Sequence, residues 1–483
     1  PPRGTWPKTE DLYVVLKVLV VTGFLLGFLD TTGFNPLDDH QFARTILQGK
    51  PFGAYYSQEL GRFYPLVAQE YVGISALFGH EASLFYRVGT LKVALLAWML
   101  SLAITSTGLQ GGRAFLLWLL GIVSFGVAST LFRLHAGDLN ALILLLGYLL
   151  LTRHSPEVMS WKSGRWWIGF LLAVCATLYK ESIAVLLLIF SGSEVIRLRL
   201  QNRWQELLRH LPIFGYALLY LGLYALWAGH PGDANYALTH QNDRATVLFR
   251  FVENNPSIFF LVLPTLLMRI VRNGRIWNRY RDFDSMLLAA MGYACLFVLL
   301  KMYSSYYLLP CMAFALVGLA GTWTANGRPQ GLAKAAPIVL VLILVEDAPA
   351  VISELVFQKQ VVVNHGRFLN YVSRWASMHC EDSDHPCELV LVGTRQKEFP
   401  EIFVSLDAFL DLVAPRRFRL REELYFSGTS WQRHFGLGHE GDFILIQPYQ
   451  SGPRLADSPS LRTVFDSGDA WAPPRWRLDQ WVY

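Results

Sequence analysis

Long apolar runs recur along most of the chain, and they constrain its fold more than any other feature of the sequence. Hydrophobic residues make up 53% of the 483 residues and charged residues only 16%. The apolar residues gather in runs of about 18 to 22, the length at which a helix crosses the core of a bilayer. The sequence therefore predicts a polytopic α-helical membrane protein with about 11 transmembrane helices. We place the spans at about 12–29, 86–106, 114–133, 139–152, 166–180, 182–196, 211–228, 256–271, 285–300, 306–323 and 332–351.

Lysine and arginine are concentrated in alternate connections between these spans. They are Arg113; Arg153, Lys162 and Arg165; Arg197, Arg199, Arg203 and Arg209; Arg269, Arg272, Arg275, Arg279 and Arg281; and Arg328 with Lys334. Basic residues accumulate in cytoplasmic loops, so we predict that these connections and the N-terminus are cytoplasmic. The formal charge of +5 is sorted by loop in this way and forms no nucleic-acid-binding face.

The first predicted outer loop, residues 30–82, is too long and too aromatic for a simple connector. Most connections are a handful of residues, and long ones are usually functional or disordered. The tyrosines and phenylalanines of the loop argue against disorder, and amphipathic pieces at about 41–48 and 66–77 would lie on the membrane surface. We predict that the loop forms a lid over the outer side of the membrane, with Asp38 and Asp39 at its mouth.

These two adjacent carboxylates have two interpretations. An Asp before a helix caps it by accepting a hydrogen bond from a free backbone amide, which suits Asp39 alone. Two consecutive carboxylates suit a general base better, because a neighbouring negative charge raises the basicity of the group that takes a proton from an acceptor hydroxyl. Arg44, Glu59 and Arg62 follow in the same loop and fit simple capping less well. We therefore predict that Asp38 or Asp39 is catalytic.

Other polar residues interrupt the apolar pattern on the predicted outer side. His135 and Asp138 occupy a short turn, where polar residues are expected in any case. Lys180 and Glu181 break an apolar run, where charges are costly in lipid and tend to be paired or functional. The alternative to a binding role is a structural ion pair of Lys180, for example with the acidic residues at 346–347.

Two more polar groups lie at span ends. Arg87 and Lys92 are near the start of the second span, where they snorkel to the surface or face a lipid phosphate. Lys301 opens a tyrosine-rich turn that includes Tyr303 and Tyr306 and leads into a helix marked by proline.

Near residue 353 the composition changes to that of a small soluble domain. We predict a boundary there, between a membrane domain at 1–353 and an α/β domain at 354–483. Segments 389–393 and 443–447 have the apolar character of short buried strands, and 402–413 that of a helix.

An odd number of spans places this C-terminal domain on the same outer side as the first loop. Cys380 and Cys387 lie close together in a polar stretch of it. An oxidising compartment favours a disulfide between them over a metal site that includes a neighbouring histidine.

Taken in order, these motifs resemble the GT-C superfamily of integral-membrane glycosyltransferases. The Asp-Asp…Arg…Gly-Arg spacing over 38–62 is similar to the opening of the bacterial serotype-converting glucosyltransferases. The Lys-Glu step at 180–181 and the Tyr-Leu-Leu-Pro stretch at 307–310 are similar to the aminoarabinose and protein-mannose transferases. The resemblance covers residues 10–320 and leaves the C-terminal domain unassigned.

The resemblance implies a multi-pass enzyme of the bacterial cytoplasmic membrane, acting on its periplasmic face. It would take a sugar from a polyprenyl-phosphate carrier with inversion and place it on an envelope glycan, a lipid such as lipid A or O-antigen, or a protein. No cofactor and no nucleic acid are expected. Some relatives hold a divalent cation with acidic residues, and Asp39 with Asp138 is the pair available for one here, although we favour a reaction without metal.

The residues suit such chemistry without help from the family. Displacing a lipid phosphate from an anomeric carbon requires a base at the incoming hydroxyl and cations at the departing phosphate. The cations available on the outer side are Arg62, Arg87, Lys92, Lys180, Arg244 and Lys301. The predicted substrate-binding set also includes Arg44, Glu59, Tyr64, His135, Asp138, Glu181, Tyr303 and Tyr306.

Three other classes fit the sequence less well. An O-antigen ligase or polymerase, which uses a lipid-diphosphate glycan, commonly has its large outer loop late in the chain, whereas here the large loop is the first. A sugar or lipid transporter with inverted repeats would show Gly- or Pro-broken spans in both halves, and no such pair recurs. A purely structural role would leave the Asp pair unexplained.

Overall fold

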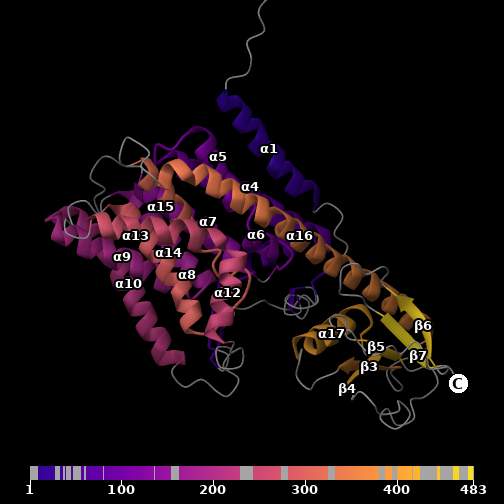
Figure 1. The fold of residues 1–483 in the computed structure, drawn as a ribbon. Coiled ribbons are helices and arrows are strands. Elements are labelled where there is room, and N and C mark those ends of the chain that lie inside the picture. The colour runs from indigo at the N-terminus through magenta and orange to yellow at the C-terminus, as the bar shows by residue number, and fades with distance from the viewer. Residues whose placement is uncertain are drawn as a thin grey trace, which may run out of the picture.

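A computed structural model of the chain shows a helical body with a small β-sheet at one end (Figure 1). It describes residues 9–27, 33–35, 39, 45–46, 56–58, 61–79, 81–134, 136–153, 163–228, 243–273, 281–324, 332–379, 387–393, 400–415, 417–424, 443–446, 461–466 and 477–481. The helices are α1 (Thr9–Gly27), α3 (Gln69–Phe78), α4 (Ala82–Thr105), α5 (Gly111–Ile122), α6 (Phe125–Thr130), α7 (Asp138–Arg153), α8 (Gly164–Tyr179), α9 (Ile183–Leu200), α10 (Trp204–Ala228), α12 (Arg244–Asn254), η2 (Ile258–Val262), α13 (Leu263–Asn273), α14 (Asp282–Leu299), α15 (Met312–Thr324), α16 (Leu332–His379) and α17 (Pro400–Val413).

The described helices make this a multi-pass membrane protein. Five stretches are long and apolar enough to cross a membrane, namely α4, Gly111–Thr130, α10, α14 and Ala335–Arg374. A sixth would consist of α12 and the helix that follows it, which are bent by 89°. Four shorter apolar helices accompany them. A described helix overlaps each of the eleven predicted spans, while the number of true spans stays a prediction.

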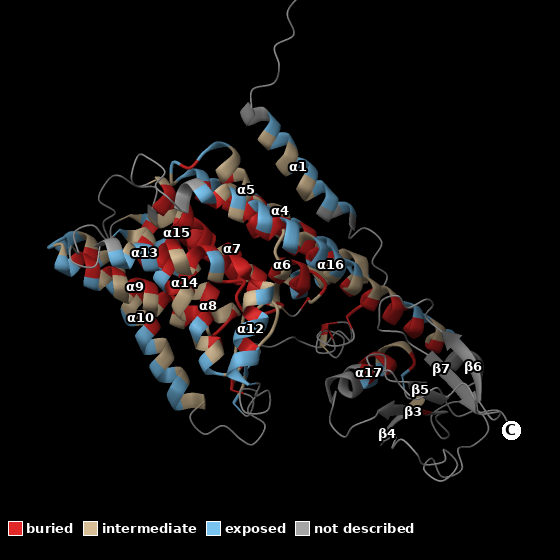
Figure 2. Ribbon diagram, in the orientation of Figure 1, coloured by how far each residue is buried: buried red, intermediate tan, exposed pale blue. Residues whose placement is uncertain are grey.

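Helix α4 shows why these sequences form membrane helices. Phe85, Tyr86 and Val93 recur on one face and are fully buried against the helical body. The opposite face exposes Leu91 and Trp98, which are equally apolar. A helix that is apolar on all sides is stable where one face packs on protein and the other meets lipid. Figure 2 shows this arrangement, with buried residues inside the helical body and exposed ones along its outer helices.

Helix α16 continues well beyond the end of its predicted span. It has 48 residues and runs through the predicted domain boundary at 353/354 without a break. Its later residues Val361, Val362, Phe368, Leu369 and Val372 are buried, because they recur at helical spacing and pack on the rest of the protein. The domain boundary itself stays a prediction.

A mixed sheet follows α16. Its strands are β3 (Cys387–Gly393), β4 (Phe418–Leu424), β5 (Phe443–Ile446), β6 (Leu461–Asp466) and β7 (Arg477–Trp481), in the order β4-β3-β5-β7-β6. Strand β3 is parallel to β4 and β5, whereas β7 is antiparallel to β5 and β6. The predicted strands at 389–393 and 443–447 and the predicted helix at 402–413 are confirmed as β3, β5 and α17.

The start of the first loop is held between α16 and α17. A Cβ at Gly33 would lie 2.5 Å from the carbonyl oxygen of Val362 and 2.6 Å from the Cα of Gly366, so only glycine fits. The carbonyl oxygen of Phe34 lies 2.7 Å from Nδ1 of His365. The Phe34 ring stacks on Phe409 of α17, with centroids 6.0 Å apart. Distant parts of the chain thus fix the backbone immediately before the Asp pair.

Candidate active site

A cavity of about 340 Å³ lies where the first loop meets the helix ends. One part of its lining is polar: Gly61, Arg62, Lys180, Glu181, Ser182, Tyr224 and Tyr307. The other part is apolar: Val185, Leu221, Ala228, Leu296, Phe297, Leu300 and Met302. The apolar part comes from α9, α10, α14 and the turn before α15. The cavity therefore has a charged head and an apolar flank.

Lys180 stands at the head of this cavity because α8 ends one residue before it. The backbone of Lys180 is extended, and its amide donates to the carbonyl of Ala176, which closes the last turn of α8. The side chain is almost buried, with Nζ 3.3 Å from Oδ2 of Asp138. Nζ also lies 4.7 Å from the centre of the Tyr307 ring and 5.5 Å from that of Tyr306. An ion pair and two aromatic faces thus hold the ammonium in place.

Arg62 reaches the same place from a hairpin of the first loop. Strands β1 (Tyr56–Ser57) and β2 (Arg62–Phe63) pair antiparallel, and Gly61 supplies the left-handed backbone before β2. The Tyr224 hydroxyl of α10 donates to the Gly61 carbonyl at 2.5 Å. Nη1 of Arg62 donates to Oε1 of Glu181 at 2.9 Å, and both side chains are largely buried. The guanidinium also lies 5.9 Å from the centre of the Tyr64 ring.

Some polar atoms at the charged end of the cavity lack a hydrogen-bond partner in the described part of the chain. Oδ1 of Asp138 and Oε2 of Glu181 are buried and have no hydrogen bond from any residue that the structure describes. A third cation, Arg133, lies 5.3 Å from the same Tyr306 ring that Lys180 contacts. Lys180 and Arg62 line the cavity, where their charges suit an additional anionic group.

Asp39 lies elsewhere in the fold and is fully buried. Its Oδ2 accepts hydrogen bonds from the backbone amide of Asn35 at 3.0 Å and from the Tyr86 hydroxyl at 2.7 Å. Its Oδ1 accepts from the backbone amide of Leu134 at 3.0 Å. In this arrangement Asp39 holds the loop to α4 and to the segment after α6. Asp38 lies outside the described residues, so the catalytic role of the pair stays a prediction.

Asp39 and Asp138 are also the carboxylates that the sequence offers to a divalent cation. Both oxygens of Asp39 accept protein donors. In the part of the chain that the structure describes, no three His, Cys, Asp or Glu side chains are grouped as a metal site requires. The expectation of a reaction without metal stays a prediction.

Lys92 does not line the cavity; it pairs with Glu70 of α3. Its Nζ lies 2.6 Å from Oε1 of Glu70 and donates to the Tyr71 hydroxyl at 3.1 Å. Glu70 also accepts from Asn140 at 2.7 Å and from the Tyr179 hydroxyl at 3.2 Å. Burial alone would raise the pKa of Glu70, but Lys92 and the hydrogen bonds from Lys92 and Asn140 lower it overall. Glu70 thus ties the first loop to α4, α7 and α8.

Four other predicted residues are placed away from the cavity lining. Arg87 is exposed on α4, and Arg244 is exposed at the start of α12. Tyr303 packs on α12, where it is hydrogen-bonded to Asn254 and lies 5.2 Å from the Phe251 ring. Lys301 has a left-handed backbone and is half-buried. The remaining predicted positions, Arg44, Glu59, His135, Cys380 and the side chain of Cys387, lie outside the described part of the chain.

Sequence reasoning missed several residues that shape this region. Tyr307 and Arg133 contact the Lys180 head group or its aromatic support, and Glu70 anchors the loop. Signals for them existed. Glu70 is the single charge between residues 66 and 77, Arg133 ends an apolar run beside a polar turn, and Tyr307 belongs to the tyrosine-rich turn.

No protein-family model and no curated protein matches this sequence. The fold is similar to the crystal structure of ArnT from Cupriavidus metallidurans bound to undecaprenyl phosphate, at 13% identity and a TM-score of 0.49 over 96% of this chain and 98% of that one. It is similar to the arabinofuranosyltransferase AftD from Mycobacteria, at 14% identity and 0.49, over 98% of this chain and 40% of that one. It is also similar to an oligosaccharyltransferase from Archaeoglobus fulgidus, at 10% identity and a TM-score of 0.47, over 85% of this chain and 64% of that one.

The last two names are those of glycosyltransferases, the class of enzyme that the sequence motifs resemble. The likenesses extend over most of this chain at low identity. They carry no conclusion about its chemistry, which rests on the residues of its own cavity.

Proposed function

We propose that this chain is an inverting membrane glycosyltransferase. It transfers a sugar from a polyprenyl-phosphate monosaccharide to a cell-envelope acceptor on the outer face of the bacterial cytoplasmic membrane. The observation that carries the proposal is that Lys180 and Arg62, both largely buried, line the same end of a cavity with an apolar flank. An ammonium and a guanidinium side by side suit a phosphate, which accepts several charge-assisted hydrogen bonds.

The apolar flank supports a lipid-linked donor over a soluble one. Val185, Leu221 and Leu296 line the cavity from α9, α10 and α14. Further out on α10 and α14, Leu226 and Leu299 are 82% and 64% exposed, as expected for side chains that meet lipid. A donor with a phosphate head and an isoprenoid tail would enter sideways from the bilayer and bring its phosphate to the two cations.

We infer the following reaction for this site. The acceptor hydroxyl attacks the anomeric carbon as the bond from that carbon to the phosphate oxygen breaks, which inverts the configuration. Lys180 and Arg62 stabilise the negative charge that develops on the departing phosphate. A carboxylate of the Asp pair takes the hydroxyl proton, and we assign this role to Asp38 because both oxygens of Asp39 already accept protein hydrogen bonds.

The test compares Lys180→Met with the double variant Lys180→Met/Asp138→Asn in detergent. Lys180→Met alone leaves the buried Asp138 without its partner and should lower the melting temperature strongly. The double variant removes both charges and should recover stability. Because a hydrogen bond to a charged group contributes about 1.5 to 3 kcal/mol, both variants should bind undecaprenyl phosphate roughly ten- to a hundredfold more weakly than the wild type.

Lys92→Met is the matched control, because it also removes a lysine from a carboxylate but outside the cavity. It should lower stability without changing affinity for undecaprenyl phosphate. Wild-type affinity in the stable double variant would defeat the assignment of Lys180 to the donor phosphate. Transfer is then measured with a radiolabelled polyprenyl-phosphate sugar and isolated envelope fractions.

A further inference from the structure

A second polar cavity, of about 470 Å³, lies at the opposite end of the same helices. Its basic lining comes from α9, the turn after it, α10 and the residue before α14, and consists of Arg197, Arg203, Arg209, His210 and Arg281. Arg197 is 14 residues beyond the first residue of α9, so roughly 20 Å of helix separates this cavity from the candidate active site. All four arginines belong to connections that the positive-inside rule predicts to be cytoplasmic.

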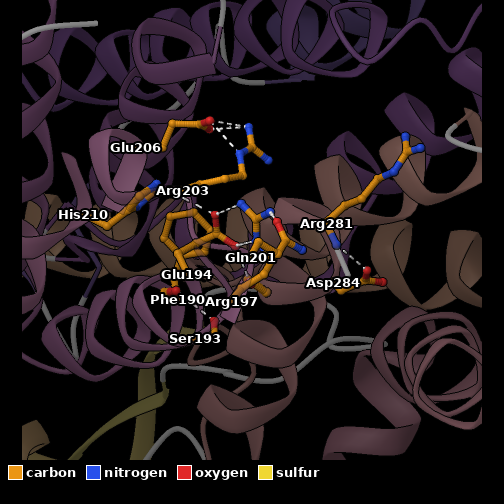
Figure 3. A network of polar contacts seen from close by, with 11 residues as sticks. Phe190, Ser193, Glu194, Arg197, Gln201, Arg203, Glu206, His210, Arg281 and Asp284 are labelled. Atoms are coloured by element: carbon orange, nitrogen blue, oxygen red, sulfur yellow. Dashed lines mark hydrogen bonds and ion pairs between the residues drawn. The ribbon is translucent and has the colours of Figure 1, made fainter. Parts of the chain in front are cut away.

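Two of these arginines form ion pairs with carboxylates. Arg197 donates to both oxygens of Glu194, at 2.8 and 2.7 Å, and Glu194 is buried and also accepts from Ser285. Arg203 makes the equivalent pair of bonds with Glu206, at 2.6 and 2.5 Å. Figure 3 shows the Arg203–Glu206 pair next to the Glu194–Arg197 pair. These forked pairs fix the walls of the cavity and use up both glutamates.

In the part of the chain that is described, Arg209 and Arg281 are not matched to a carboxylate in this way. Nε of Arg209 and Nδ1 of His210 are buried and have no hydrogen-bond partner among the described residues. Neither Arg209 nor Arg281 forms an ion pair with a residue that the structure describes. Asp282 is the third carboxylate of the lining, so four arginines face three carboxylates. The cavity thus has an excess of hydrogen-bond donors and positive charge.

We propose that this cavity binds a phosphate group, with Arg209 and Arg281 as its principal ligands. Guanidinium groups match the oxygens of a phosphate in pairs and stay charged in a partly buried site. On α10, Trp204, Leu208 and Leu211 flank Arg209 and are exposed, so the wall of the cavity borders the predicted lipid surface. The phosphate is therefore that of a lipid headgroup or of a soluble anion that enters from the predicted cytoplasm.

The experiment measures the melting temperature of the purified full chain during titration with two probes. Dioctanoyl phosphatidic acid presents a lipid phosphate monoester, and inorganic phosphate presents the soluble anion. Dioctanoyl phosphatidylcholine and matched chloride are the controls. A ligand that binds only the folded state raises the melting temperature with its concentration. Arg209→Gln/Arg281→Gln should weaken the apparent affinity about tenfold or more, whereas Arg113→Gln, on the same predicted face but outside the cavity, should leave it unchanged.

Stabilisation by phosphatidic acid alone would identify a lipid headgroup, and stabilisation by both probes a soluble phosphate. Either result supports the site, provided that the double variant loses it. Each single variant is measured as well, so that the proposal can still be tested if the double variant folds poorly. The proposal would be overturned if neither probe stabilises the wild type, or if the probes stabilise the wild type and both single variants equally. The readout needs no transferase activity and is independent of the function proposed for the outer cavity.

Discussion

Two buried ion pairs, Lys180–Asp138 and Arg62–Glu181, meet at the head of the outer cavity. A buried pair adds little net stability, since the loss of hydration offsets the attraction, although removal of one partner is costly. Two such pairs, each with a carboxylate oxygen that lacks a hydrogen bond within the described residues, are therefore poorly explained by stability alone. They suit a site in which a donor phosphate shares the cations with the carboxylates while it is bound.

The sequence predicted all four members of these pairs but not their pairing. A charge inside an apolar run signals a functional or paired residue, and this rule identified Lys180 and Glu181. The suggested structural pair of Lys180 with residues 346–347 is wrong, because Lys180 reaches Asp138 of α7 instead. Partner choice depends on which helix ends meet, and no local pattern encodes that.

Asp38→Asn and Asp39→Asn should have different effects on stability and on transfer. Asp39→Asn would place an amide group among three donors, so it should lower the melting temperature together with activity. Asp38→Asn should keep the melting temperature and slow transfer by about two to four orders of magnitude, as loss of a general base does. Thermal melting and single-turnover transfer on the same preparations separate the two. Near-normal transfer by Asp38→Asn would show that the base lies elsewhere.

Glu70→Gln should reveal a pH-dependent contribution to stability. The pKa of Glu70 is lowered in the folded protein, so its stabilisation is fully present above its unfolded value of about 4.3 and is lost as the pH falls through the folded value. The melting temperature of the wild type should exceed that of Glu70→Gln at pH 7, and the difference should shrink below about pH 4. Glu81→Gln, at an exposed position, is the control for loss of one charge. A difference independent of pH would contradict this role of Glu70.

At the scale of elements, local patterns located the helices and strands but not their junctions. Apolar periodicity marked α17, β3 and β5, which depend on nearby residues. The continuation of α16 to His379 was missed because its second half is amphipathic and resembles a soluble segment in composition. The contact of Gly33 with Gly366 joins residues more than three hundred positions apart, and only tertiary packing specifies it.

Gly33→Ala should damage the protein although the residue is outside the cavity. The added methyl group would meet backbone atoms of α16 at 2.5 to 2.6 Å, and the backbone cannot move aside as a flexible side chain would. We expect a loss of about 1 to 3 kcal/mol in the free energy of unfolding and slower transfer, because the displaced segment carries the hydrogen bond from Asn35 to Asp39. Gly73→Ala in α3, where nothing lies within 4 Å, should be neutral or stabilising. Equal melting temperatures for the two variants would contradict the tight packing of Gly33 against α16.

At the scale of the whole molecule, the two cavities lie at opposite ends of α9. The outer one has an apolar flank and two cations in ion pairs, and the other is lined by four arginines and three carboxylates. A membrane normal that runs along α9 would place one cavity at each surface. From the distribution of arginine we predict that the four-arginine cavity faces the cytoplasm and the outer cavity the periplasm.

Cysteine labelling in spheroplasts tests this orientation. In a background without the native cysteines, Ser57→Cys in the β1–β2 hairpin and Ser458→Cys, which lies outside the described residues, should react with an impermeant maleimide in intact cells. Ser163→Cys, at the start of α8, should react only after lysis. Protection of either of the first two positions in intact spheroplasts would reverse the topology and remove the periplasmic site.

The length of α16 determines how far the sheet stands from the membrane. With 48 residues it extends about 72 Å, whereas the hydrocarbon core of a bilayer is only about 30 Å thick. Even if that helix crosses the membrane along its axis, more than half of it stands beyond the lipid, with the sheet at its far end. A bulky acceptor that approaches from the outer side would therefore meet the sheet before it meets the cavity. On the predicted topology, we expect the spacing between sheet and membrane to limit the size of the acceptor, and the number of residues in a single helix sets that spacing.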